Sequence, residues 1–209
     1  DFVDGVDIIM PDPYPVPTSP LIKVLNACNS ATEAIGDTPE KTLFATLQAW
    51  ERADRRAPTA SELRGMTYLA LVGGAKGILY YSYGAAVVKN TDFGNIAYPL
   101  PESLPELWQC IKQIARELKE IEPILALPQG KIKVTADQAI AYVIKQAGRT
   151  NYIIAVNCTE QASAFKLELP LPTKKVQDLL NPEIKYQAGG DVLAEDLEGY
   201  GARVYRLDF

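Results

Sequence analysis

The clearest local pattern in the chain lies in residues 59–83, where a capped helix leads directly into a buried strand. Thr59 and Glu62 have the spacing of a capping box, which marks the start of a helix, and apolar residues then recur at helical spacing. Two glycines end the helix, and an apolar strand follows over residues 77–81. A helix that feeds a buried strand predicts an α/β unit, and such units carry their chemistry at the carboxyl end of the strand.

Two further strands and two further helices are predicted in the first part of the chain. Residues 6–10 and 43–48 are short apolar runs that indicate buried strands. Residues 18–35 have helical periodicity after a Thr-Ser-Pro start. Residues 85–102 are predicted to form a long loop. A long amphipathic helix then closes the segment, and Pro123 disfavours its continuation. Three strand–helix steps in succession predict a parallel α/β segment over residues 1–125.

The periodicity changes from helical to alternating in the remainder of the chain, residues 126–209. Short alternating runs separated by turn residues are typical of an antiparallel β-sandwich. These runs are residues 131–134, 139–144, 152–156, 165–169, 174–179 and 202–207. The fold class is therefore α/β followed by all-β.

Three strand–helix units do not close a barrel, which takes eight. The segment 1–125 is therefore either a small open sheet or the carboxyl part of a (β/α)8 barrel whose first strands lie elsewhere. An incomplete barrel exposes apolar sheet edges, which favour association. An upstream barrel segment or self-association is the expected partner, whereas a stable monomer would indicate a self-contained small fold.

The chain contains no histidine. This excludes a Ser-His-Asp triad, a Cys-His pair and a histidine metal site. Acid–base chemistry must come from carboxylates, tyrosine or lysine, and paired carboxylates are the groups that glycoside hydrolysis uses. The three cysteines have no metal-type or disulfide-type spacing, so no metal and no cofactor are predicted.

Charge and hydropathy exclude two further classes. The net charge is −5 and the pI about 4.9, without a basic stripe, so a nucleic-acid partner is not expected. No apolar run approaches the ~20 residues that span a membrane, so no membrane partner is expected. The chain begins at Asp1 and shows no signal peptide, which leaves the compartment open, extracellular and periplasmic included.

Polar side chains that follow the first two predicted strands are the candidate catalytic and binding groups. Asp12 lies between two prolines after the first strand and is either a catalytic or hydroxyl-binding carboxylate or a turn residue. Glu51 is either a displaced nucleophile or a surface charge paired with Arg52 or Arg55. Gln48 ends the second strand and is predicted to hydrogen-bond a sugar, although it cannot act as acid or nucleophile.

Aromatic residues surround the same strand ends. They are predicted to stack on sugar rings, with core packing as the alternative, and they are Tyr14, Trp50, Tyr81 and Tyr83. Tyr80 and Tyr81 alternate along the strand, so one of the two faces the interior of a barrel.

The ordered segments resemble a known family. They are a strand ending in DPYP, a strand ending in QAWE, the helix PTASELRGMTYLAL, the strand GAKGILYYSY and a β domain ending in GYGARVYRL. This order resembles strands six to eight of the glycosidase barrels in the retaining clan that includes the β-galactosidases, with their appended C-terminal β-sandwich. The likeness covers nearly the whole chain, and its most specific part is GAKGILYYSYG.

The resemblance implies a glycoside-hydrolase-like protein that acts on a polysaccharide or glycoside, with a carbohydrate as ligand. That clan takes its acid/base from the fourth strand, which would precede Asp1, and its nucleophile, a glutamate, from the end of the seventh. The seventh strand matches Leu43–Gln48, which ends without a glutamate; Glu51 comes three residues later. The alternative is a non-catalytic carbohydrate-binding or structural module.

Overall fold

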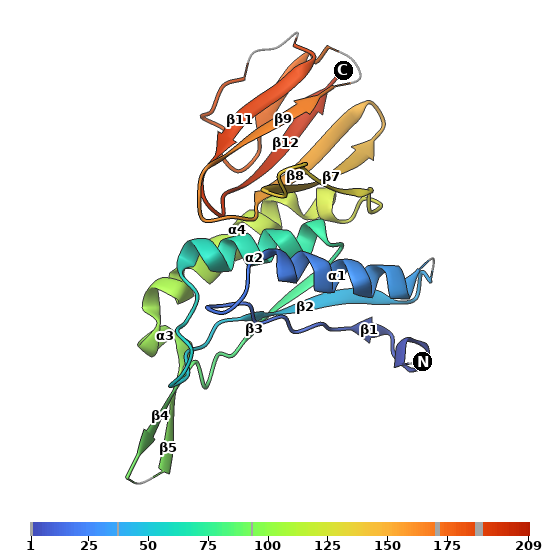
Figure 1. Cartoon of the computed structure of the whole chain (residues 1–209). Coiled ribbons are helices and arrows are strands. Elements are labelled where there is room, and N and C mark those ends of the chain that lie inside the picture. Colours follow the sequence, from blue (N-terminus) through green and yellow to red (C-terminus); the bar gives the residue numbers. More distant parts are fainter. Residues whose placement is uncertain (1, 37, 93, 170–171, 187–189) are drawn as a thin grey trace. The chain divides into compact units, whose positions relative to one another are not determined.

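The computed structural model describes residues 2–36, 38–92, 94–169, 172–186 and 190–209 (Figure 1). The chain forms two compact units, Asp1–Arg116 and Glu117–Phe209. The last long helix, α4 (Pro105–Leu125), belongs in part to each unit, whereas the sequence predicts the division at the end of this helix.

The first unit contains a three-stranded parallel sheet with strand order β1-β2-β3. Its strands are β1 (Ile8–Ile9), β2 (Thr42–Gln48) and β3 (Gly77–Tyr81). Helix α1 (Ile22–Ile35) connects β1 to β2, and helix α2 (Ala60–Val72) connects β2 to β3. A single 3-10 turn, η1 (Phe2–Gly5), precedes β1, and the short helix α3 (Leu100–Ser103) precedes α4. The predicted order of parallel strand–helix steps is confirmed.

The two faces of this sheet differ in their environment. Leu43, Ala45 and Leu47 of β2 are buried on one face, and α1 and α2 both contact β2. On the other face, Leu79 and Tyr81 of β3 are 40 % and 49 % exposed. We call this second face the open face; an exposed apolar sheet face is a site where further chain is expected to pack.

A close approach explains how α1 and α2 pack together. A Cβ atom at Gly73 would lie 2.5 Å from the Cβ of Cys28 on α1, so only glycine fits at the end of α2. The Thr32 hydroxyl on α1 donates a hydrogen bond to the Gly73 carbonyl at 2.8 Å. Gly73, the first of the two glycines that end the predicted helix, therefore also sets the distance between the two helices.

The predicted capping box at the start of α2 is confirmed. The Thr59 hydroxyl accepts a hydrogen bond from the Glu62 amide at 3.2 Å, and the Glu62 carboxylate accepts one from the Thr59 amide at 2.7 Å. Both nitrogens of the Arg56 guanidinium also donate to this carboxylate, at 2.7 and 2.8 Å. The local sequence thus fixes where α2 begins.

Three local predictions in the first unit are wrong. Helix α1 begins at Ile22 rather than residue 18, because the amides of Thr18 and Ser19 donate to the Pro15 carbonyl and form a separate turn. Helix α4 continues through Pro123 for two more residues, since a proline in the last turn leaves most of the helix bonding intact.

The predicted long loop at 85–102 is the third wrong prediction. It contains a hairpin of β4 (Val87–Thr91) and β5 (Gly94–Tyr98), whose strands are antiparallel. All five residues of β5 are exposed. The polar tip of this hairpin shows little alternation of apolar and polar residues, so the sequence does not predict its two strands.

The second unit contains two antiparallel sheets. One has the strand order β10-β12-β8-β7-β6, and the other pairs β11 with β9. The strands are β6 (Ile132–Val134), β7 (Ile140–Ala147), β8 (Thr150–Asn157), β9 (Ser163–Glu168), β10 (Lys175–Asp178), β11 (Val192–Leu197) and β12 (Ala202–Asp208). Six of these strands are predicted from the sequence, and β11 is not.

The two sheets of the second unit share one apolar core. Ile140, Ile153 and Tyr205 of the larger sheet lie in the same buried cluster as Phe165 and Leu193 of the smaller one. The arrangement is a small antiparallel sandwich, as the alternating pattern predicts. None of the helices in the described ranges is both long and apolar enough to cross a membrane.

Candidate functional site

The carboxyl ends of β1, β2 and β3 meet at one edge of the parallel sheet, and the predicted site residues follow these ends. This edge is where parallel α/β sheets carry their ligand sites. The residues are Asp12 and Tyr14 after β1, Gln48, Trp50 and Glu51 at the end of β2, and Tyr81 and Tyr83 at the end of β3.

Three aromatic rings from the three strand ends pack together. The ring centroids of Tyr14 and Trp50 are 5.7 Å apart, with the rings edge to face at 89°. The rings of Tyr14 and Tyr81 are stacked, with centroids 6.2 Å apart and planes at 26°. We call these three residues the aromatic cluster. Trp50 is 8 % exposed and Tyr81 is half exposed, so the cluster has a buried base and an accessible rim.

Arg52 packs over the ring of the tryptophan in this cluster. Its guanidinium carbon lies 5.0 Å from the centroid of the Trp50 ring. Its Nη1 atom donates to the carbonyl oxygens of Glu51 at 2.8 Å, Ala85 at 3.1 Å and Ala86 at 3.3 Å. Arg52 therefore ties the segment after β2 to the segment after β3, a role that the sequence does not indicate.

Glu51 is anchored through its backbone. Its amide donates to the Ala86 carbonyl at 2.7 Å, and the residue forms a bridge with Val87. Within the described residues, the Glu51 carboxylate makes no hydrogen bond or ion pair, and the predicted alternative of a pair with Arg52 or Arg55 is wrong. This half-buried carboxylate is available to a ligand.

Asp12 and Tyr14 interact electrostatically. Asp12 is exposed, between its two prolines. Burial raises the pKa of the Tyr14 phenol, and the nearby charge of Asp12 and the phenol of Tyr81 raise it further. Tyr14 thus remains protonated at neutral pH and can donate a hydrogen bond.

Gln48 lies beneath the site rather than on its surface. The side chain is fully buried. Its Oε1 accepts from the Val16 amide at 3.2 Å, and its Nε2 donates to the Val16 carbonyl at 3.0 Å. Both ends of the amide are therefore used to hold the segment after β1 against the end of β2.

Tyr83 lies apart from the aromatic cluster. Its ring packs edge to face against Trp108 of α4 at 5.7 Å, and the residue is 60 % exposed. The predicted alternation along β3 is also seen, since the Tyr80 hydroxyl is 2.9 Å from the Thr67 hydroxyl on α2 while Tyr81 joins the aromatic cluster.

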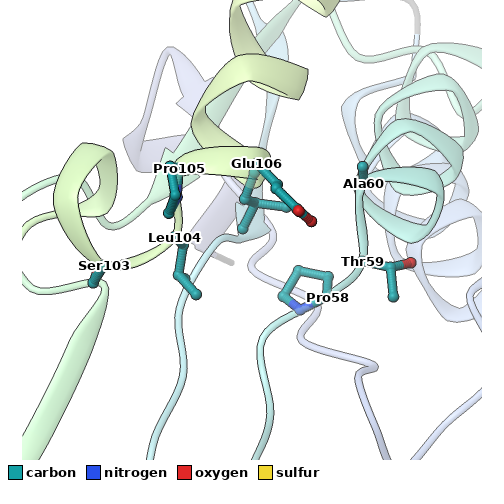
Figure 2. A pocket seen from close by; sticks show the side chains of 8 residues that line it. Pro58, Thr59, Ala60, Ser103, Leu104, Pro105 and Glu106 are labelled. Atoms are coloured by element: carbon teal, nitrogen blue, oxygen red, sulfur yellow. The ribbon is translucent and has the colours of Figure 1, made fainter.

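A separate pocket lies at the starts of α2 and α4. It has a volume of about 450 Å³, and its lining includes Pro58, Thr59 and Glu106. Figure 2 shows Glu106 reaching from the start of α4 toward the start of α2. None of the predicted site residues lines this pocket. Among the residues that the structure describes, no group of three or more His, Cys, Asp or Glu side chains could hold a metal ion.

Comparison with known proteins gives a likeness of fold. No model of a known family matches the sequence, and no curated protein matches it either. Among solved structures, the α-amylase from Geobacillus thermoleovorans complexed with acarbose has a TM-score of 0.60 at 18 % identity, covering 87 % of this chain and 42 % of that one. The α-galactosidase I from Mortierella vinacea has a TM-score of 0.54 at 14 % identity, covering 90 % of this chain and 44 % of that one.

A third structure gives the same result. An Anoxybacillus α-amylase has a TM-score of 0.54 at 17 % identity, covering 86 % of this chain and 40 % of that one. The chain thus spans less than half the length of these solved structures. At such identities the likeness shows the fold alone, a mixed helix-and-sheet arrangement that this chain shares with part of each of these structures. The structures are α-amylases and an α-galactosidase, whereas the resemblance in the sequence is to the clan of the β-galactosidases.

Proposed function

We propose that the chain is the carboxyl part of a (β/α)8-barrel glycoside hydrolase and binds a polysaccharide or glycoside at the carboxyl edge of β1, β2 and β3. The observation that carries this proposal is the aromatic cluster beside two available carboxylates at that edge. Aromatic faces suit the C–H faces of sugar rings, and carboxylates suit both sugar hydroxyls and glycosidic chemistry. The likeness in fold to α-amylases and an α-galactosidase supports the same class of ligand.

In this proposal β1, β2 and β3 are the last three barrel strands, and the open face is the barrel interior. Ile8 of β1, Leu79 and Tyr81 are each at least 40 % exposed there. The remaining strands would come from an upstream segment or from another chain. Size-exclusion chromatography and denaturant unfolding test this point, since a stable, non-associating monomer would argue for a self-contained fold.

Asp12 and Glu51 are the proposed catalytic carboxylates of this chain, and the acid/base would come from the missing strands. A retaining enzyme, as in the clan of the β-galactosidases, needs its two carboxyl groups about 5–5.5 Å apart. Gln48 is proposed to position the segment after β1, because its amide is already bonded to Val16. Tyr14, Trp50 and Tyr81 would form the sugar platform, and Tyr83 would contact only an extended ligand.

The test is binding and hydrolysis with a panel of maltotriose, cellotriose and raffinose. Calorimetry on the 209-residue chain gives the Kd of each sugar, and Tyr14→Ala is expected to abolish binding because it removes the ring that contacts both Trp50 and Tyr81. Tyr83→Ala, which removes an exposed ring outside the cluster, is the matched control and should leave these short sugars bound. If neither this chain nor a protein that includes the upstream strands binds any sugar of the panel, the proposal is wrong.

A non-catalytic carbohydrate-binding module is the second candidate function. It is favoured by one observation: the residue that ends β2, at the expected nucleophile position, is a buried glutamine rather than a glutamate. Saturable binding without hydrolysis, in a protein that includes the upstream strands, would select this candidate. Release of reducing sugar by the same protein would select the hydrolase.

A further inference from the structure

Two buried polar atoms at the candidate site have no hydrogen-bond partner. Among the described residues, Trp50 Nε1 and Ser82 Oγ are the buried side-chain nitrogen and oxygen atoms without one. Native proteins pair nearly all such atoms, because burial without a partner forfeits the hydrogen bond to water. An unpartnered buried group therefore needs an explanation, and here two occur at one edge of one sheet.

The two residues follow a hydrogen-bonded pair of neighbouring strands. Gln48 of β2 is the register partner of Tyr81 of β3, and the Ala49 amide donates to the Tyr81 carbonyl at 2.7 Å. Trp50 comes directly after Ala49, and Ser82 directly after Tyr81. The two unpartnered atoms thus belong to adjacent segments at the edge where the aromatic cluster lies.

The surrounding contacts hold the tryptophan without using its N–H group. Tyr14 packs against the Trp50 ring, and Arg52 lies over it at 5.0 Å. Arg52 itself donates to three backbone carbonyls, which restrains the segment that carries the ring. These contacts fix the indole through its ring, and no described residue accepts a hydrogen bond from its N–H group.

The chemistry of the two atoms defines the complementary ligand group. An indole N–H only donates, whereas a serine hydroxyl donates and accepts. A sugar hydroxyl can accept from the indole and either donate to or accept from the serine, so the hydroxyl groups of a polyhydroxyl ligand match both atoms in chemistry. An apolar ligand would leave both atoms unpaired.

We propose that Trp50 Nε1 and Ser82 Oγ are the specificity-determining pair that hydrogen-bonds hydroxyl groups of the bound carbohydrate. This inference rests on the proposed carbohydrate-binding function and names the atoms that recognise the ligand. The pair is kept at a cost to folding, because each atom gives up water without gaining a protein partner. Removing Ser82 Oγ should therefore weaken binding without destabilising the free chain.

The experiment combines Ser82→Ala with calorimetry and thermal unfolding of the 209-residue chain. The Kd for the sugar of the maltotriose, cellotriose and raffinose panel that binds is expected to rise about three- to tenfold, the value of one hydrogen bond. The Tm of the free variant should equal or exceed that of the wild type. Trp50→Phe, which removes the indole donor, should weaken binding at least as much.

Matched controls separate recognition from structure. The Ser103 hydroxyl already donates to the Pro99 carbonyl at 2.7 Å, so Ser103→Ala should lower the Tm and leave the Kd unchanged. Trp108→Phe changes the other tryptophan of the chain and should also leave the Kd unchanged.

The outcomes are distinguishable. An unchanged Kd in Ser82→Ala, with binding by the wild type, overturns the pair but not the proposed function. A Tm that falls in Ser82→Ala as it does in Ser103→Ala overturns the pair, because the hydroxyl would then have a structural partner. Absence of binding both by the wild-type chain and by a protein that includes the upstream strands overturns both proposals.

Discussion

Arg203→Met tests how the two sheets of the second unit are held together. Arg203 lies on β12 and is 8 % exposed. Its Nε atom is 2.8 Å from the Glu195 carboxylate on β11 and 3.4 Å from the fully buried Asp178 carboxylate on β10. The guanidinium also meets Glu198 at 2.9 Å. One cation thus neutralises carboxylates that come from both sheets.

The expected cost follows from the burial of these carboxylates. Replacing Arg203 by methionine keeps the apolar stem and leaves Asp178 and Glu195 without their cation. Breaking a buried ion pair from one side costs about 3–5 kcal/mol, whereas the largely exposed Glu198 adds little. For a unit of this size, a loss of 3 kcal/mol lowers the Tm by at least about 12 °C.

Urea unfolding followed by circular dichroism measures the free energy of unfolding, and hydrogen exchange of the β12 amides reports the second unit by itself. Arg206→Met is the matched control on the same strand, because Arg206 makes an exposed pair with Asp208 at 3.2 Å and should change stability by less than about 1 kcal/mol. Adding Asp178→Asn and Glu195→Gln to Arg203→Met should restore part of the loss, since the buried charges are then gone. Equal effects of Arg203→Met and Arg206→Met would refute the reasoning.

Three further predictions concern the first unit. Glu62→Gln should lower the free energy of unfolding by about 1 kcal/mol at pH 7, because the carboxylate caps α2. Burial raises the pKa of Glu62, but hydrogen bonds from the Arg56 guanidinium and from Thr59 together outweigh it and lower the pKa from its ordinary 4.5. Urea titrations should therefore show the full stability difference between wild type and Glu62→Gln above pH 4.5, and this difference should disappear as the pH falls through the folded-state pKa. In a variant that lacks Trp108, Arg52→Met should increase acrylamide quenching of Trp50 fluorescence, because it removes the guanidinium that covers the Trp50 ring. Arg64→Met removes a similar cation–π contact within α2 and should leave the quenching unchanged. In a protein that includes the proposed upstream strands, Glu51→Gln should reduce kcat less than tenfold, about 1.4 kcal/mol, and Asp12→Asn should reduce it more. A far larger loss at Glu51 that azide rescues would instead make Glu51 the nucleophile.

The local sequence predicts elements whose signals lie within one segment. The capping box at Thr59 and Glu62, the apolar strands β2 and β3, and the alternation in most strands of the sandwich all depend on residues a few positions apart. Such signals depend on the backbone period and on short-range hydrogen bonds, which a single segment contains. The parallel α/β order and the change to an all-β unit follow from them.

Strand β11 shows where this reasoning stops. Leu193 and Leu197 of β11 lie in the core. Glu195 is two positions from each of them along the strand, so its side chain lies on the same inward face. A glutamate at an inward position hides the alternation in the sequence. It is accommodated because Arg203 on another strand supplies its counter-charge, which no local pattern can indicate.

The candidate site divides in the same way. The sequence by itself determined that Asp12, Tyr14, Trp50 and Tyr81 follow the ends of parallel strands, because strand direction places those ends at one edge of the sheet. Only the tertiary structure decided that Gln48 bonds Val16, that Arg52 holds the indole and that Tyr83 packs elsewhere. The first contact joins residues 32 positions apart in the chain, and the last joins the segment after β3 to helix α4. The contact of Arg52 with Trp50 depends on side-chain direction. The geometry of all three exists only once the strands have paired.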